Sequence, residues 1–92
     1  MTKERIVQEL RNRKRELANR FGVKRLALFG SFARDENTEK SDIDLWVEME
    51  PSAEKFFALQ SYLEKLFDHP VDLGTKLRRY VAKKTQNEMI FI

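Results

Sequence analysis

Apolar residues line one helical face over the first twenty residues of the chain. The residues on this face are Ile6, Val7, Leu10, Leu17, Ala18 and Phe21. This spacing predicts an amphipathic helix from Lys3 to Arg20, which Gly22 ends. No apolar residue falls on the stripe at the turn Asn12-Arg13-Lys14. We therefore expect the basic cluster from Arg11 to Arg15 to face water or a binding partner.

Two shorter apolar patterns follow. The run Leu26-Ala27-Leu28-Phe29, ended by Gly30-Ser31, is typical of a strand buried on both faces, and we expect a helical turn after it. Residues 42–49 instead alternate, with Ile43, Leu45, Val47 and Met49 on one side and Asp42, Asp44, Trp46 and Glu48 on the other. This alternation predicts a strand with one face in the core and the other in contact with solvent or a ligand.

The second half of the chain predicts one longer helix and several short elements. The helix opens at Pro51-Ser52, with Ser52 as its N-cap, and ends at Asp68-His69-Pro70, where His69 is a turn residue. Its apolar stripe is Phe56, Phe57, Leu59, Leu63, Leu66 and Phe67, which we assign to the core.

The last three elements are short. Val71-Asp72-Leu73 predicts a third strand, and Leu77, Tyr80 and Val81 predict a further short helix. Met89-Ile90-Phe91-Ile92 predicts a terminal strand or a docking segment. No repeat, linker or low-complexity segment interrupts residues 1–92, and 92 residues suffice for one compact domain with its own core.

Composition narrows the class of protein. Apolar residues make up 41% of the chain and charged residues 36%, which suits a small folded domain and not a disordered segment. The absence of cysteine excludes disulfides, thiolate zinc sites and a cysteine nucleophile. No apolar run approaches the length of a membrane span, and the first residues contain no apolar signal region. These features predict an unprocessed cytoplasmic protein.

The net charge of +3 hides an uneven distribution. Residues 35–72 contain 11 acidic and 3 basic residues, whereas residues 1–34 contain 3 acidic and 10 basic residues. A nucleic-acid-binding protein usually spreads positive charge over its working surface. An acidic block between basic flanks favours a site that binds metal ions and phosphate, although most single charges are expected on ordinary solvated faces.

Three features together indicate chemistry. Asp42 and Asp44 would leave one face of a strand about 7 Å apart, where they repel each other unless a cation lies between them. Mg²⁺ binds to such carboxylates together with substrate phosphates, and Asp72 on a neighbouring strand would complete a two-metal site. Gly30 allows close approach of a ligand to the backbone, and Ser31 offers a hydroxyl and an N–H group to phosphate oxygens. The combination suits phosphoryl or nucleotidyl transfer from a nucleoside triphosphate. Without the glycine-serine turn, Asp42 would be expected only to begin a strand and Asp44 only to face water. Asp72, between Val71 and Leu73, could also be an ordinary exposed strand residue.

These segments carry a resemblance to a known family. Leu28-Phe29-Gly30-Ser31-Phe32-Ala33-Arg34, followed by Ser41-Asp42-Ile43-Asp44-Leu45, resembles the signature of minimal nucleotidyltransferases of the DNA polymerase beta superfamily. Val71-Asp72-Leu73 is similar to the segment with the family's third carboxylate, and residues 87–92 are similar to the family's ending. The resemblance implies an α/β (α+β) nucleotidyltransferase fold, in which helices pack against a small mixed sheet.

The resemblance also implies roles for single residues. Gly30 and Ser31 would bind the nucleotide, Asp42 and Asp44 would bind two Mg²⁺ ions, and Asp72 would act with them and help to activate the acceptor hydroxyl. Arg34 is a further candidate for nucleotide binding. It would contact phosphate or a partner's acid, or else compensate the charge of the acidic block.

The implied activity is the transfer of AMP from ATP to a hydroxyl, expected to be a tyrosine, of a partner protein. Family members of this size resemble antitoxins paired with helical HEPN-type ribonuclease toxins. Asp35 departs from the family pattern, which usually has glycine after the arginine of the motif. This substitution could alter the turn, and it adds negative charge near the triphosphate.

Two other functions fit the same sequence. A binding module could keep the fold and neutralise a partner by contact alone, and Asp35 is the feature that favours weak catalysis. A nucleic-acid-directed domain could use the basic cluster Arg11, Arg13, Lys14 and Arg15. Trp46 could stack on a base, although packing beneath a helix is the better expectation.

Overall fold

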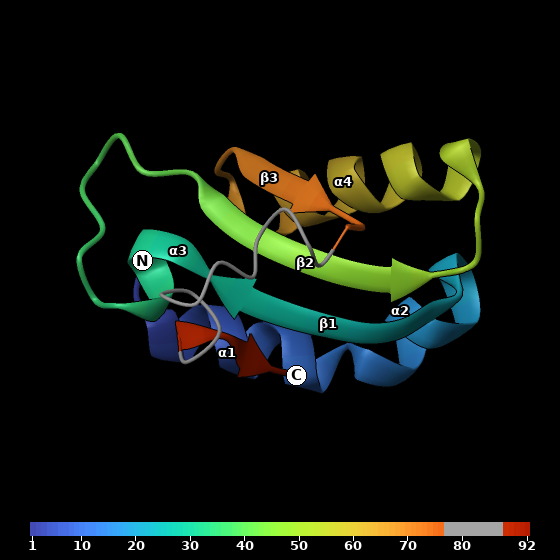
Figure 1. The fold of residues 1–92 in the computed structure, drawn as a ribbon, viewed down its shortest axis with the longest axis horizontal. Coiled ribbons are helices and arrows are strands. Elements are labelled where there is room, and N and C mark those ends of the chain that lie inside the picture. The colour runs from blue at the N-terminus through green and yellow to red at the C-terminus, as the bar shows by residue number, and fades with distance from the viewer. Residues whose placement is uncertain (77–87) are drawn as a thin grey trace.

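Helices and strands alternate along most of the chain (Figure 1). The computed structural model describes residues 1–76 and 88–92. The elements in chain order are α1 (Lys3–Asn12), α2 (Lys14–Phe21), β1 (Val23–Phe29), α3 (Gly30–Ala33), β2 (Ile43–Met49), α4 (Ala53–Phe67), β3 (Val71–Gly74) and β4 (Ile90–Phe91). The expected terminal strand is present as β4. The short helix expected at Leu77, Tyr80 and Val81 lies outside the described residues.

The first helix is broken where the apolar stripe lapses. We expected one helix from Lys3 to Arg20, and this is wrong at Arg13, whose ψ of 10° separates α1 from α2. The Arg13 side chain folds back and donates to the carboxylate and the main-chain carbonyl of Glu9. Without an apolar residue at this turn, no packing opposes the break. α2 then ends as expected at Gly22, which adopts the left-handed conformation with φ of 70°.

The strands form one mixed sheet in the order β3-β2-β1-β4. β1 pairs antiparallel with β2 on one side and with β4 on the other, whereas β2 and β3 run parallel. β1 begins at Val23, three residues before the apolar run that predicted it, because its first residues pair with the end of β2. The mixed α+β architecture confirms the predicted fold class.

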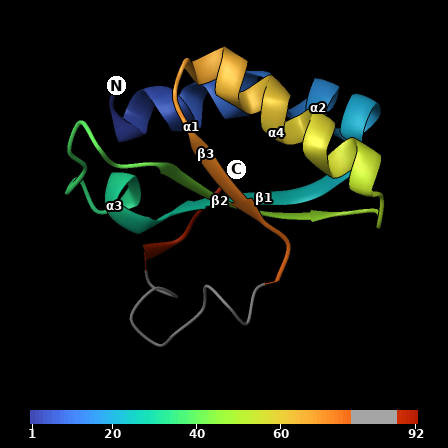
Figure 2. The same cartoon turned by 90° about the horizontal axis from the view of Figure 1, so that it is seen from above.

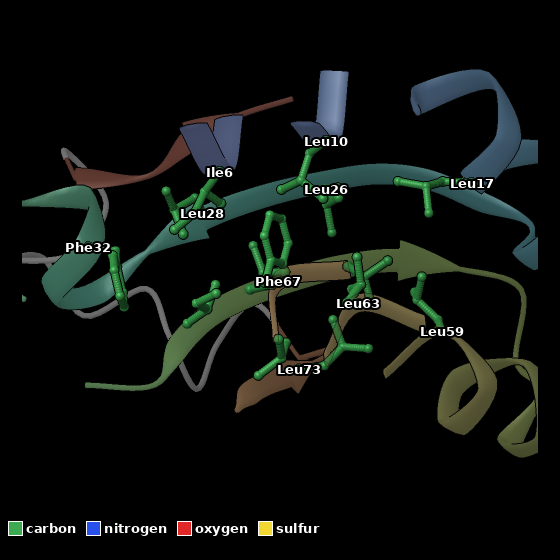
Figure 3. Packing of buried hydrophobic residues seen from close by; sticks show 14 of the residues in the cluster. Ile6, Leu10, Leu17, Leu26, Leu28, Phe32, Leu59, Leu63, Phe67 and Leu73 are labelled. Atoms are coloured by element: carbon green, nitrogen blue, oxygen red, sulfur yellow. The ribbon is translucent and has the colours of Figure 1, made fainter. Parts of the chain in front are cut away.

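The sheet carries its helices on one face. Figure 2 shows α1, α2 and α4 on the same side of the strands. The main core lies between these layers and includes the residues labelled in Figure 3, which are Ile6, Leu10, Leu17, Leu26, Leu28, Phe32, Leu59, Leu63, Phe67 and Leu73. The apolar set of β2 joins this core, since Ile43, Leu45 and Val47 are all fully buried. The predicted core face of β2 is therefore confirmed, whereas Trp46 on the other face is buried as well.

α4 behaves as the sequence predicts. The Ser52 side chain accepts a hydrogen bond of 3.1 Å from the Lys55 N–H group and so caps the helix. Within the expected apolar stripe, however, Phe57 is 62% exposed and does not belong to the core. None of the helices in the described part of the chain is long and apolar enough to cross a membrane.

Candidate active site

Strand pairing places two of the three predicted aspartates side by side. Asp44 on β2 stands opposite Asp72 on the parallel strand β3. Paired residues on neighbouring strands project from the same face of a sheet, so both carboxylates lie on the face away from the helices. Asp42 is exposed and immediately precedes Ile43, the first residue of β2. The structure thus brings the predicted carboxylates to one corner of the sheet.

The glycine-serine turn lies directly against this corner. Phe29, the last residue of β1, pairs with Asp44, and Gly30 then turns the chain with a φ of 75°. Figure 1 shows α3 directly at the end of β1. A methyl group added to Gly30 would lie 2.2 Å from Oδ2 and 2.9 Å from Cγ of Asp44. Glycine is required here both for the left-handed backbone and for the close carboxylate. Ser31 follows as a partly buried residue of α3.

The arrangement changes the acidity of Asp44. The pKa of the Asp44 carboxyl is raised from 3.8 to about 6, first by burial and then by the negative charges of Asp72 and Asp42. The positive charge of Arg34 acts in the opposite direction on this pKa. A carboxylate that is costly to ionise beside two others is a place where a cation would be stabilised.

Arg34 is held by two acidic side chains. Its guanidinium donates to Glu36 at 3.0 Å and to Glu88 at 3.1 Å. These two hydrogen bonds raise the pKa of Arg34 above its usual range. Arg34 was expected either to contact phosphate or a partner's acid, or to compensate acidic charge. In the structure it pairs with acidic side chains of its own chain. A nucleotide would have to compete with Glu36 and Glu88 for this side chain.

The carboxylates fit Mg²⁺ by their chemistry, although they do not form a closed cage. Within residues 1–76 and 88–92, no three acidic, histidine or cysteine side chains are already arranged to hold a metal ion. Mg²⁺ commonly takes only one or two protein carboxylates and completes its shell with water and substrate phosphates. Asp44 and Asp72, paired on one face and mutually repulsive, supply oxygen ligands of this kind. Mg²⁺ bound here would stabilise negative charge on a triphosphate.

Asp35 stands at the turn position where the family pattern has glycine. Its φ of 58° is the left-handed conformation that glycine adopts easily and that aspartate tolerates better than most residues. Its carboxylate forms an ion pair of 2.9 Å with Lys3. Asp35 thus adopts the backbone conformation of the turn, and its negative charge is paired with Lys3.

Trp46 is buried rather than open to a ligand. It is 3% exposed and packs with Ala27, Phe29 and Met89 on the face of the sheet opposite the main core. Its indole N–H group donates to the Thr75 carbonyl at 3.2 Å. Its neighbours among residues 1–76 and 88–92 are strand and loop residues, so packing within the chain explains this side chain.

Half of the basic cluster is engaged within the chain. Arg11 donates to the Phe91 carbonyl at 3.2 Å, and Arg13 pairs with Glu9 and is partly buried. Lys14 and Arg15 are exposed. The expectation that the whole cluster faces outward is thus wrong for Arg13, because the helix break turns its side chain back along α1.

Comparisons with known proteins agree with this geometry. The family described as nucleotidyltransferase domain matches residues 8–92. A protein of Thermococcus cleftensis named protein adenylyltransferase is 41% identical over 96 residues, covering 100% of this chain and 97% of its own length. A protein of Methanocaldococcus jannaschii, provisionally named protein adenylyltransferase, is 42% identical over 94 residues, covering 95% of this chain and 94% of its own. No solved structure gave a significant match.

The family match spans the glycine-serine turn and all three aspartates, and the fold sets the turn against Asp44 beside Asp72. The relatives are similar over nearly their whole length, so the likeness is not confined to a short motif. On both grounds, this chain is a minimal nucleotidyltransferase and belongs to the nucleotidyltransferase domain family.

Proposed function

We propose that this protein transfers AMP from ATP to a hydroxyl group, expected to be a tyrosine, of a partner protein. The observation that carries the proposal is the contact between Gly30 and Asp44, with Asp72 paired to Asp44 on the next strand. It joins a turn suited to phosphate oxygens with carboxylates suited to Mg²⁺. The relatives' names, protein adenylyltransferase, support a protein as the acceptor.

The residues divide the reaction between them. Gly30 and Ser31 hold the triphosphate, while Asp42, Asp44 and Asp72 would hold two Mg²⁺ ions, which shield the phosphate charges. The acceptor oxygen attacks the α-phosphorus, a new P–O bond forms, and the bond to the departing pyrophosphate breaks. Asp72 is the most accessible carboxylate on the strands and takes the proton of the acceptor hydroxyl. Asp44 lies against the Gly30 turn, and so fixes the phosphate-binding turn relative to the metal-binding carboxylates.

The partner we propose is a HEPN-type toxin, which the protein silences as its antitoxin. The described chain is nearly all used by the sheet, its helices and the site, so it offers little surface for a dedicated acceptor-binding unit. An acceptor that is itself a folded protein would not need such a unit, because its own structure can present the hydroxyl to the site. Exposed apolar side chains at Phe57 and Phe91 are available for contact with such a partner.

Two alternatives predict different outcomes. A contact inhibitor would need no catalytic carboxylate, and Asp35, its favouring feature, adopts the glycine-like turn and pairs with Lys3. A nucleic-acid-directed domain would rely on the exposed Lys14 and Arg15, and its binding would weaken steeply with salt. Neither alternative requires the carboxylates for its action, whereas nucleotidyl transfer does.

The test is transfer of label from ATP, labelled at the α-phosphate, into the proteins of a host lysate. Wild type should label one discrete protein in the presence of Mg²⁺, and mass spectrometry should place AMP on a tyrosine of that protein. Asp42→Asn with Asp44→Asn should abolish labelling, whereas Asp68→Asn, at an exposed helix end, should not. A partner that co-purifies with both wild type and the double variant, without any labelling, would establish the contact inhibitor instead.

A further inference from the structure

His69 lies between the two halves of the candidate site. Its ring nitrogen Nε2 donates to the main-chain carbonyl of Ser41, the residue immediately before Asp42. The same ring meets Phe32 edge to face, with centroids 5.7 Å apart and planes at 89°. Phe32 belongs to α3, the turn that begins with Gly30 and Ser31. One side chain therefore contacts both the turn and the chain segment that bears Asp42.

The backbone on either side of Asp42 is tied to the same short segment. The carbonyl of Ser41 is bound by the ring of His69, and the N–H group of Ile43 donates to the carbonyl of Pro70 at 3.0 Å. Asp42 is exposed and lies outside β2, and the pairing of β2 with β3 begins at the next residue, Ile43, which stands opposite Val71. The contacts with His69 and Pro70 therefore help to hold the entrance to the strand, together with the hydrogen bond of 3.1 Å from the Ser41 N–H group to the Thr38 carbonyl.

The segment that carries His69 is itself anchored. The His69 N–H group donates to the Glu64 carbonyl at 3.3 Å, and the Val71 N–H group donates to the Glu64 carboxylate at 3.1 Å. Asp72 follows directly after Val71. The end of α4 therefore sets the position of His69 and, through it, the distance between Asp42 and the strand that bears Asp72.

We propose that His69 is a positioning residue for nucleotidyl transfer: its Nε2–H group holds the Ser41 carbonyl, and so fixes Asp42 relative to the Gly30 turn and Asp72. This goes beyond the turn role that the sequence indicates. A carbonyl oxygen can only accept, so Nε2 must bear the proton. The inference rests on the proposed function, because the position of Asp42 matters to the reaction only if the carboxylates bind metal-nucleotide.

Three variants separate the hydrogen bond from packing. His69→Phe keeps a ring against Phe32 but removes the donor, whereas His69→Gln keeps an N–H donor at similar reach but removes the ring. Tyr62→Phe is the matched control, because it removes one side-chain hydrogen bond, of 2.9 Å to Glu16, far from the carboxylates. If His69 only stabilises the fold, the His69→Phe and Tyr62→Phe variants should behave alike in nucleotide binding and in hydrogen exchange.

Two measurements report on the positioning. Electron paramagnetic resonance follows the binding of Mn²⁺ with ATP, with Mn²⁺ as an oxygen-ligated substitute for Mg²⁺. Hydrogen exchange of the Ile43 amide, compared with that of Leu63 in the core of α4, follows the strand entrance in metal-free protein. The second measurement depends on neither metal nor activity.

For His69→Phe we expect Mn²⁺–ATP binding about tenfold weaker, as for other residues that orient a metal ligand, and faster exchange at Ile43 relative to Leu63. His69→Gln and Tyr62→Phe should stay close to wild type in both measurements. Unchanged binding and exchange in His69→Phe would overturn the proposal, and so would a His69→Gln variant as defective as His69→Phe. If wild type fails to bind Mn²⁺–ATP, the metal-binding part of the proposed function fails, and the Ile43 exchange alone decides the role of His69.

Discussion

Replacing Asp44 with asparagine should stabilise the metal-free protein while abolishing transfer. The folded structure raises the pKa of the Asp44 carboxyl from 3.8 to about 6, first through burial and then through the charges of Asp72 and Asp42. One pKa unit corresponds to about 1.4 kcal/mol, so ionising Asp44 in the folded state costs at most about 3 kcal/mol. Asp44 keeps contact with solvent, and screening reduces the net effect on unfolding to about 1–2 kcal/mol.

The sign of this effect depends on pH. A carboxyl with a raised pKa binds its proton more tightly in the folded state than in the unfolded state, so the ionised form destabilises the fold. The stabilising contribution of protonated Asp44 is fully present below about pH 3.8 and is lost as the pH rises through about 6. Asp44→Asn removes the ionisation, so its advantage should be absent below pH 3.8 and complete near pH 7.

Thermal and urea unfolding in the presence of a chelator would measure this difference. At pH 7.5 the variant should melt about 4–10 °C above wild type, which corresponds to about 1–2 kcal/mol for a domain of this size. Asp68→Asn controls for the loss of one exposed negative charge. The reasoning is refuted if Asp44→Asn lowers the melting temperature at pH 7.5, or if its gain persists below pH 3.8.

Three further substitutions test single contacts. Gly30→Ala should cost at least about 1–2 kcal/mol in urea unfolding from its left-handed backbone, and should lose most labelling activity because the new methyl displaces the Asp44 carboxylate. Asp35→Gly should change the free energy of unfolding by less than about 1 kcal/mol and keep activity, since it relieves a positive φ but loses an exposed ion pair with Lys3; loss of labelling would show that Asp35 acts in the site. Trp46→Phe should lower the unfolding free energy by at least about 1 kcal/mol through the lost hydrogen bond to Thr75, and unchanged stability would contradict that role.

Local patterns predicted most of the secondary structure. The alternation over residues 42–49 depends only on side-chain type, and it placed Ile43 and Leu45 in the core and Asp44 on the opposite face. The Ser52 cap was also predictable, because its hydrogen bond to the Lys55 N–H group joins residues only three positions apart. The break at Arg13 was visible as a gap in the stripe, but spacing alone does not show whether such a gap bends a helix or merely exposes it.

Contacts between distant parts of the chain could not be predicted in this way. The ion pair of Arg34 with Glu88 joins residues 54 positions apart and depends on where β4 meets β1. The contact of His69 with Ser41 likewise depends on the parallel pairing of β2 and β3. The resemblance indicated which residues would share a site, whereas the close fit of Asp44 on Gly30 is a property of the folded chain.

The most direct measurement compares ATP labelled at the α-phosphate with ATP labelled at the γ-phosphate, each incubated with the purified protein, Mg²⁺ and a host lysate. Nucleotidyl transfer predicts that a single acceptor protein gains the α-label and not the γ-label, and that Asp44→Asn abolishes the signal. Incorporation of the γ-label would show phosphoryl transfer instead, and an α-label that persists in Asp44→Asn would show that these carboxylates do not carry the reaction.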